Sequence, residues 1–141
     1  MKFYIASKVN QAEPAVNELK REIENLGHEI IYDWTENIIP KPFKENIEAV
    51  SKAAEDMANA VMNCDALIVL CAKDGLGMHI ETGGALVASI ILSFIKNRPE
   101  KNIYVVGKNN DRSVFYFHKS VKRVSDIPTL ITILKQDFKS F

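Results

Sequence analysis

The chain has 141 residues, 47% of them hydrophobic and 26% charged, which is ordinary for one globular domain spanning residues 1–141. Lysine and arginine total 18, and so do aspartate and glutamate, so no net charge indicates nucleic acid or an anionic membrane as a partner. The two cysteines, Cys64 and Cys71, flank and end an apolar run, which favours reduced thiols in a cytoplasmic protein over a disulfide framework. The apolar stretch Met1–Ala6 is too short for a secretory signal.

The first third of the chain predicts two strands around one helix. Phe3–Ala6 is a short β-rich run that suits a strand buried on both faces. Apolar residues then keep helical spacing over Pro14–Leu26, and Gly27 supplies the stop. His28–Tyr32 predicts a second strand, and the proline-containing segment Asp33–Phe43 predicts a loop.

The middle of the chain predicts helix, strand, loop and helix. Glu45–Val61 is amphipathic at helical spacing, and Ala66–Cys71 is apolar throughout, as expected of a central strand. The glycine-bearing loop Lys73–Met78 leads into a helix over His79–Lys96. Its block Ala85–Ile95 is shorter than the roughly 20 residues of a membrane span, so we expect a buried helix and no membrane partner. Because the block is apolar almost all round, it also predicts a homodimer or higher oligomer.

The last third predicts two further strands and a helix. Ile103–Val106 ends at Gly107, Val121–Val124 is a short strand, and Ser125 is expected to cap a helix running to about Phe138. Strands that alternate with helices predict a parallel sheet with right-handed crossovers. The expected fold is therefore three-layer α/β/α, with a flavodoxin-like, doubly wound, five-stranded parallel sheet.

Ligands of such sheets bind beyond the carboxyl ends of the strands, near the first strand. Three loops are candidates on that ground: Ser7–Gln11, Asp33–Phe43 and Lys73–Met78. Ser7 and Lys8 could receive a 5′-phosphate, or they could be plain turn residues. Trp34 could stack on a base, or it could anchor its loop.

The most unusual stretch is Asp74–Leu86, which follows the clearest strand. Gly75 and Gly77 allow backbone conformations or close approaches that other residues resist. The pair Gly83–Gly84 costs about 1 kcal/mol per residue inside a helix, so the sheet, a substrate or a partner helix is expected to come close there. Glu81 falls near the start of this helix, where a carboxylate is either favoured by the helix dipole or functional.

This stretch resembles the signature of the nucleoside 2-deoxyribosyltransferases, in which the glutamate is the nucleophile. The resemblance lies in Gly75-Leu76-Gly77-Met78 followed by Glu81-x-Gly83-x-Ala85-Leu86, although His79 and Ile80 make the motif longer than in the best-known transferases. The opening Phe3-Tyr4-Ile5-Ala6-Ser7 resembles the first strand of the family, whose tyrosine orients the nucleophile. Asp56 resembles its base-side acid, and Asp74 resembles an acidic residue close before the nucleophile.

The resemblance implies cleavage or transfer at the N-glycosidic bond of a (2-deoxy)ribonucleoside or its 5′-monophosphate, in nucleotide salvage and without a cofactor. Glu81 would capture C1′ in a covalent glycosyl intermediate while Tyr4 holds its carboxylate. Asp56 would protonate the leaving base and then activate the acceptor. The remaining expected substrate contacts are Ser7, Lys8, Trp34, Asp74, Gly75, Gly77, Met78 and His118.

Several alternatives accompany this hypothesis. Apart from the resemblance, Asp56 fits a solvated helical residue and Tyr4 fits a packed strand aromatic. The transferases also take a polar residue from a partner subunit, for which the candidates are Tyr116, His118, Asn109 and Asn110. Two other functions stay open: a non-catalytic nucleotide-binding or sensor protein on the same scaffold, and a glycohydrolase of a larger nucleotide such as NAD.

Other site chemistries lack their motifs. The sequence has no Gly-x-x-x-x-Gly-Lys-Ser/Thr loop, and the dinucleotide fingerprint fails at Ile80. His79-Ile80-Glu81 matches the His-x-Glu of zinc deaminases, but their Pro-Cys-x-x-Cys partner is missing. His28, His79 and His118 have no metal-ligand spacing, so we expect no metal.

Overall fold

The five predicted strands form one parallel sheet. The computed structural model describes residues 1–8 and 13–138, so Val9–Gln11 of the first predicted ligand loop lie outside the described residues. The strand order is β2-β1-β3-β4-β5, and every neighbouring pair is parallel. This order confirms the flavodoxin-like, doubly wound sheet. The strands are β1 (Lys2–Ser7), β2 (Glu29–Ile30), β3 (Ala66–Leu70), β4 (Asn102–Val106) and β5 (Val121–Val124).

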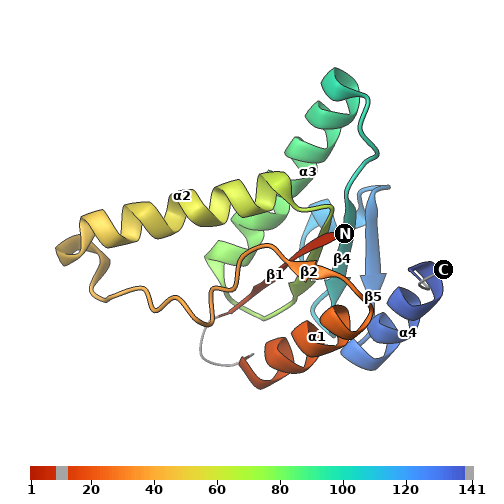
Figure 1. Ribbon diagram of the computed structural model, residues 1–141, viewed down its shortest axis with the longest axis horizontal. Coiled ribbons are helices and arrows are strands. Elements are labelled where there is room, and N and C mark those ends of the chain that lie inside the picture. The colour runs from red at the N-terminus through yellow and green to blue at the C-terminus, as the bar shows by residue number, and fades with distance from the viewer. Residues whose placement is uncertain (9–12, 139–141) are drawn as a thin grey trace.

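Helices cover both faces of this sheet, as Figure 1 shows. One face carries α1 (Glu13–Asn25) and α4 (Ile127–Asp137), and the other carries α2 (Ile47–Asn63) and α3 (Leu76–Lys96). Two short 3-10 helices, η1 (Phe43–Glu45) and η2 (Val114–Phe117), lie in the connections.

Alternation along β1 sends neighbouring side chains to opposite layers. Phe3 meets Phe138, just beyond α4, with ring centroids 6.0 Å apart. Tyr4 points the other way and reaches α3. Both residues are fully buried, so the central strand is covered on both faces, as its sequence predicts.

Two predicted helix starts were wrong. α3 begins at Leu76, three residues before His79, because Gly75 adopts a φ of 135° that brings the chain directly from the loop into the helix. α4 is capped by Asp126 and not by Ser125, since the Asp126 carboxylate accepts a 2.8 Å hydrogen bond from the backbone N–H of Thr129.

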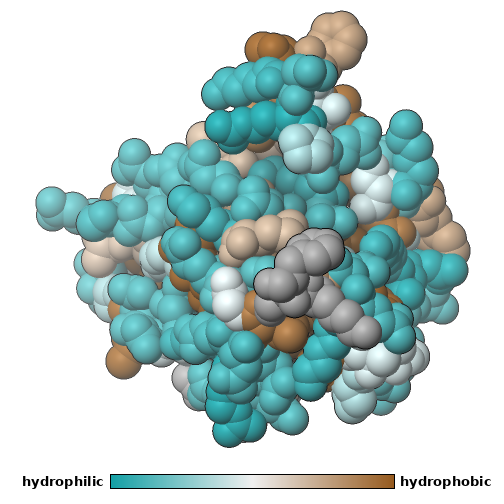
Figure 2. All heavy atoms as spheres, turned by 45° about the vertical axis from the view of Figure 1, so that its right-hand side comes forward, coloured by the Kyte–Doolittle hydropathy of each residue, from teal (hydrophilic) through white to brown (hydrophobic). Residues whose placement is uncertain are grey.

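The prediction that α3 is buried holds for one side only. Thr82, Ala85 and Ser89 are buried, whereas Val87 and Phe94 are 57% and 91% exposed. Figure 2 shows a mainly hydrophilic face with hydrophobic side chains gathered at its top, where Figure 1 places the C-terminal end of α3. By length and composition alone α3 could cross a membrane, a criterion that apolar core helices also meet. Here the helix forms part of a layer over the sheet.

A buried lysine binds the carboxyl-terminal end of α2. Lys101 is 8% exposed, and its ammonium donates to the backbone carbonyls of Met62, at 2.7 Å, and of Cys64. These carbonyls end α2, where a cation also interacts favourably with the helix dipole. Its backbone N–H donates to Ser89 Oγ at 2.8 Å, so the residue also ties the second half of α3 to the chain just before β4.

Replacing Lys101 with methionine is expected to lower the free energy of unfolding by about 1–3 kcal/mol, because two buried carbonyls lose their donor. Urea denaturation measures this loss. Lys122→Met is the matched control, since Lys122 forms an exposed ion pair with Asp137 and should matter by less than about 1 kcal/mol. Equal stability of the two variants would contradict the assigned role of Lys101.

Candidate functional site

The predicted nucleophile and its predicted tyrosine are in contact. The Tyr4 hydroxyl donates a 2.6 Å hydrogen bond to Glu81 Oε1. α3 follows β3, the neighbour of β1, and packs against β1, so its second turn meets the side chain that β1 sends to this face. A rigid strand and a helix therefore hold the carboxylate in one orientation.

Burial sets the charge state of this pair. Desolvation raises the pKa of Glu81 from 4.5 to about 7, and the hydrogen bond from Tyr4 opposes part of that rise. Burial and the neighbouring Glu81 charge raise the pKa of Tyr4 well above its ordinary value. Tyr4 therefore stays protonated near neutral pH, where it can donate its hydrogen bond to an ionised Glu81.

Glu81 lies in the wall of an apolar groove between α2 and α3. The groove has a volume of about 540 Å³ and is lined mainly by alanine, methionine and aliphatic side chains. Among the described residues that line it, Glu81 is the one charged side chain. Gly77 and Gly84 also line the groove. An added Cβ at Gly84 would make an ordinary 3.6 Å contact with Val61 of α2, and one at Gly83 would meet nothing within 4 Å among the described residues. The expected close approach at the glycine pair is therefore not explained by α2.

The predicted acid, Asp56, lies on α2 and outside the residues that line this groove. Its carboxylate pairs with Lys52 at 3.0 Å, one helical turn earlier. Its charge contributes, after burial, to raising the pKa of Tyr32. The Tyr32 ring is 6.5 Å from the Tyr4 ring.

Tyr32, which is next to Tyr4, was not among the residues singled out from the sequence. It follows β2 at the carboxyl edge of the sheet, the edge at which ligands of this fold bind. That position, at the end of the second predicted strand, was the available signal.

Lys8 and Asp74 meet each other but not Glu81. Their side chains form a 2.7 Å ion pair that lowers the pKa of Asp74. They line a separate cavity of about 420 Å³ with residues that follow β3, β4 and β5. Ser7 Oγ, at the end of β1, is buried and has no hydrogen-bond partner among the described residues. Lys8 and Asp74, the expected contacts of a phosphate and of a sugar, thus lie at the same sheet edge as Glu81 but in a different cavity.

Two predicted contacts have side chains in the core. Trp34 is 8% exposed and its indole N–H donates to the carbonyl of Ile5 at 2.8 Å, which agrees with the loop-anchor alternative and not with base stacking. Met78 is 2% exposed and packs below Gly75, so the expected substrate contact through its side chain is not present. The early start of α3 explains this, because Met78 faces inward from the first turn.

The candidates near the C-terminus lie in turns around η2. His118 Nδ1 accepts from the backbone N–H of Ser120 at 3.2 Å, while Asn109 and Asn110 bond to Arg112 and to the carbonyl of Val124. These three residues stabilise turns within the chain.

Tyr116 of η2 forms a second polar pair with His79 of α3. Its hydroxyl is 2.9 Å from His79 Nδ1, and both residues line a cavity of about 430 Å³ that is distinct from the α2–α3 groove. Burial raises the pKa of the neighbouring Cys71 thiol to about 11. That thiol is protonated at neutral pH and is a poor nucleophile.

Comparisons with known proteins support the fold. No family model matches the chain. The cyclic di-AMP synthase CdaA of Bacillus subtilis (strain 168) is 32% identical in a 99-residue alignment that covers 67% of this chain, and the match spans only 36% of the length of that relative. The structure of the Clostridium botulinum CMP N-glycosidase BcmB is similar with a TM-score of 0.63 at 15% identity, covering 96% of this chain and 99% of that one. The chain therefore has the fold of this N-glycosidase over nearly its whole length.

Proposed function

We propose that the protein cleaves the N-glycosidic bond of a nucleoside or of its 5′-monophosphate, with Glu81 as the nucleophile. The observation that carries this proposal is the 2.6 Å hydrogen bond from Tyr4 to Glu81 in the wall of the groove. The similarity of fold to a CMP N-glycosidase supports it. The longer motif, with His79 and Ile80 inserted, still leaves Glu81 against Tyr4.

The proposed reaction has two steps. A Glu81 carboxylate oxygen bonds to C1′ as the bond from C1′ to the base nitrogen breaks, and the departing base takes a proton from an acid. Asp56 is the proposed acid, because it resembles the base-side acid of the nucleoside 2-deoxyribosyltransferases. Water or a second base then attacks C1′, releases Glu81 and passes its proton to Asp56. The acceptor decides whether the enzyme is a hydrolase or a transferase.

Incubation with a panel of nucleosides and 5′-monophosphates, with and without a free acceptor base, tests the proposal. Chromatography is expected to show base release with water as acceptor, or base exchange when a second base is present. CMP is the first member of the panel, because the structural neighbour is a CMP N-glycosidase. A folded protein that turns over no member of the panel would contradict the proposal.

Tyr4→Phe is expected to lower turnover about 10–100-fold, which corresponds to the loss of one hydrogen bond to a charged group. It should also change the pH dependence. In wild-type protein kcat/KM should rise with pH through about 7, as Glu81 ionises. Because the Tyr4 hydrogen bond lowers the pKa of Glu81, the variant should rise at a higher pH. Rate profiles from about pH 5 to pH 9 measure this, and an unchanged midpoint counts against the role of Tyr4.

The exposed face of α3 supports a homodimer as the working form. Val87, Ile91 and Phe94 are 57%, 48% and 91% exposed and continue the apolar wall that contains Glu81. Light scattering is expected to show a dimer at micromolar concentration, and Phe94→Glu is expected to give a monomer, because a charge would replace buried apolar area. Val114→Glu, at an equally exposed apolar residue of η2, is the control that should stay dimeric. A wild-type monomer would remove the dimer proposal.

A nucleotide-binding protein without catalysis is the second candidate. Two observations favour it: Asp56 is paired with Lys52 outside the groove lining, and Glu81 has a pKa of about 7. The matching relative is the synthase of a cyclic dinucleotide, which is compatible with a larger nucleotide as ligand. Calorimetry that detects binding of CMP or a dinucleotide, together with no turnover, would select this candidate.

A further inference from the structure

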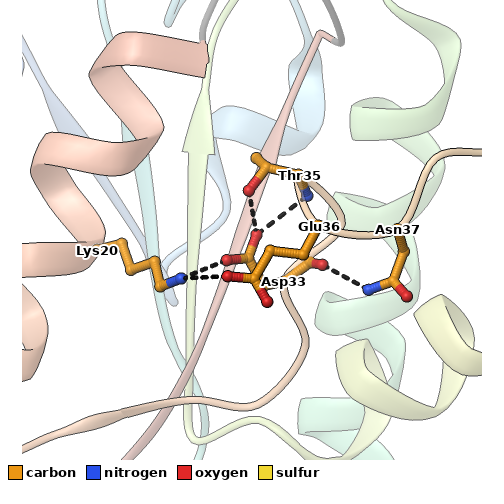
Figure 3. Close-up of polar contacts among 5 residues, drawn as sticks. All are labelled: Lys20, Asp33, Thr35, Glu36 and Asn37. Atoms are coloured by element: carbon orange, nitrogen blue, oxygen red, sulfur yellow. Dashed lines mark hydrogen bonds and ion pairs between the residues drawn. The ribbon is translucent and has the colours of Figure 1, made fainter.

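The loop after β2 is held by a partly buried polar cluster, which Figure 3 shows. Asp33 is the centre of this cluster, with a side chain that is 14% exposed. Its carboxylate accepts from Lys20 Nζ of α1 at 2.5 Å and from the backbone N–H and hydroxyl of Thr35 at 3.0 and 2.5 Å. Asn37 Nδ2 donates to its backbone carbonyl at 2.7 Å. We call Lys20, Asp33, Thr35 and Asn37 the Asp33 tether.

The same loop is also bonded to β1 at two places. The backbone N–H of Ile31 donates to the carbonyl of Phe3 at 2.9 Å, and the Trp34 indole donates to the carbonyl of Ile5 at 2.8 Å. Tyr32 lies between these anchors and directly before Asp33. Its backbone is therefore fixed on both sides, although it lies outside the two residues of β2.

The side chain of Tyr32 lies beside the Tyr4–Glu81 pair. Its ring is 6.5 Å from that of Tyr4, at an interplanar angle of 32°, and Tyr4 bonds to Glu81. Burial, and to a smaller extent the charge of Asp56, raise the pKa of Tyr32. Tyr32 is also partly exposed, in contrast to the fully buried Tyr4.

We infer that Tyr32 is a substrate-contacting residue of the Glu81 site and that the Asp33 tether positions it. The inference rests on the proposed function, because it takes Glu81 as the nucleophile. A nucleoside with C1′ at Glu81 extends its base along the neighbouring side chains, and Tyr32 is the partly exposed aromatic ring next to the Tyr4–Glu81 pair. An aromatic face suits this contact, since rings stack on bases without regard to sequence.

The tether explains how a loop residue can make a defined contact. A tyrosine on a mobile loop would lose side-chain and backbone entropy each time a ligand binds. Here the bonds of Asp33 and the anchors on β1 fix the loop before the ligand arrives. Loss of the tether should therefore weaken binding through Tyr32 alone.

Binding of CMP, measured by calorimetry in the Glu81→Gln background so that nothing is consumed, tests the inference. If the panel identifies another nucleoside as substrate, that nucleoside replaces CMP. Tyr32→Leu, which keeps apolar bulk but removes the ring, should weaken binding about ten-fold. Tyr32→Phe, which keeps the ring, should stay within about three-fold of the unsubstituted protein. Circular dichroism checks that each variant is folded.

Lys20→Met tests the tether, and Lys135→Met is its matched control. Lys135 pairs with Glu22 at 3.2 Å between α4 and α1, away from Tyr32. Lys20→Met should weaken binding, while Lys135→Met should not. The double variant Lys20→Met/Tyr32→Leu should bind no more weakly than Tyr32→Leu, because both changes act through one side chain. Losses that add, or full binding by Tyr32→Leu, would overturn the inference.

The same measurements separate the inference from the proposed function. Binding that depends on Tyr32, in a protein that turns over no substrate, supports the inference and removes the catalytic proposal. Turnover that depends on Glu81 but not on Tyr32 supports the catalytic proposal and removes the inference about Tyr32. If the protein neither binds CMP nor turns over any panel member, both the inference and the proposed function are overturned.

Discussion

Glu81→Gln is expected to lower turnover by about 10³-fold or more while it leaves nucleotide binding nearly unchanged. The amide cannot form the glycosyl ester, and loss of a nucleophile typically removes almost all of the chemical step. The substitution keeps the shape of the side chain, and its carbonyl oxygen can still accept the hydrogen bond from Tyr4. The effect should therefore appear in kcat and not in the dissociation constant of the ligand.

Glu24→Gln is the control for this experiment, because Glu24 is an exposed glutamate of α1. It should retain full turnover. Mass spectrometry of the wild-type protein, quenched during turnover, should detect a glycosyl group on the peptide that contains Glu81. Full activity of Glu81→Gln would exclude the covalent mechanism.

The second large effect is on stability, and it depends on pH. Burial raises the pKa of Glu81 from 4.5 to about 7, so the folded protein binds this proton more tightly than the unfolded chain does. The contribution of the protonated Glu81 carboxyl to the free energy of unfolding is fully present below about pH 4.5 and is lost as pH rises through 7. A shift of this size corresponds to about 3 kcal/mol.

Glu81→Gln removes this pH dependence, since glutamine does not ionise. The free energy of unfolding of the variant, relative to wild type, should therefore increase by up to about 3 kcal/mol between about pH 4 and pH 8. Urea denaturation of both proteins at these two values measures the change, and all other titrating groups are common to both. A constant difference would show that Glu81 is not an uncompensated buried carboxylate. The expected result means that the site costs stability at neutral pH.

The fold could be predicted because the hydrophobic pattern of each segment matches the burial of the strand or helix that it forms. Ala66–Leu70 is apolar at every position and is fully covered in the structure. Gly27, predicted as a helix stop, has a φ of 80°. The start of α3 could not be predicted in this way, because Leu76 is 82% exposed and carries no inward pattern. At α4, Ser125 and Asp126 are both good caps, and only the bond to Thr129 distinguishes them.

The contact between Tyr4 and Glu81 was predictable only through the resemblance. The two residues are 77 positions apart, and no periodicity links them. Trp34 and Met78 show the limit of such arguments, because the sequence places a residue in a loop or first turn but does not say which way its side chain points. Tyr32 carries no motif, and its place beside Tyr4 is established only in the folded chain.

The position of Trp34 gives the molecule an intrinsic spectroscopic reporter. It is the one tryptophan among the 141 residues, and its ring is buried with its N–H bonded to Ile5, next to the strand that carries Tyr4. Its emission therefore comes from a single, shielded environment at the junction of β1 and the Asp33 tether. A movement of this junction, on ligand binding or at the onset of unfolding, is expected to shift the emission wavelength of Trp34, so no added label is needed.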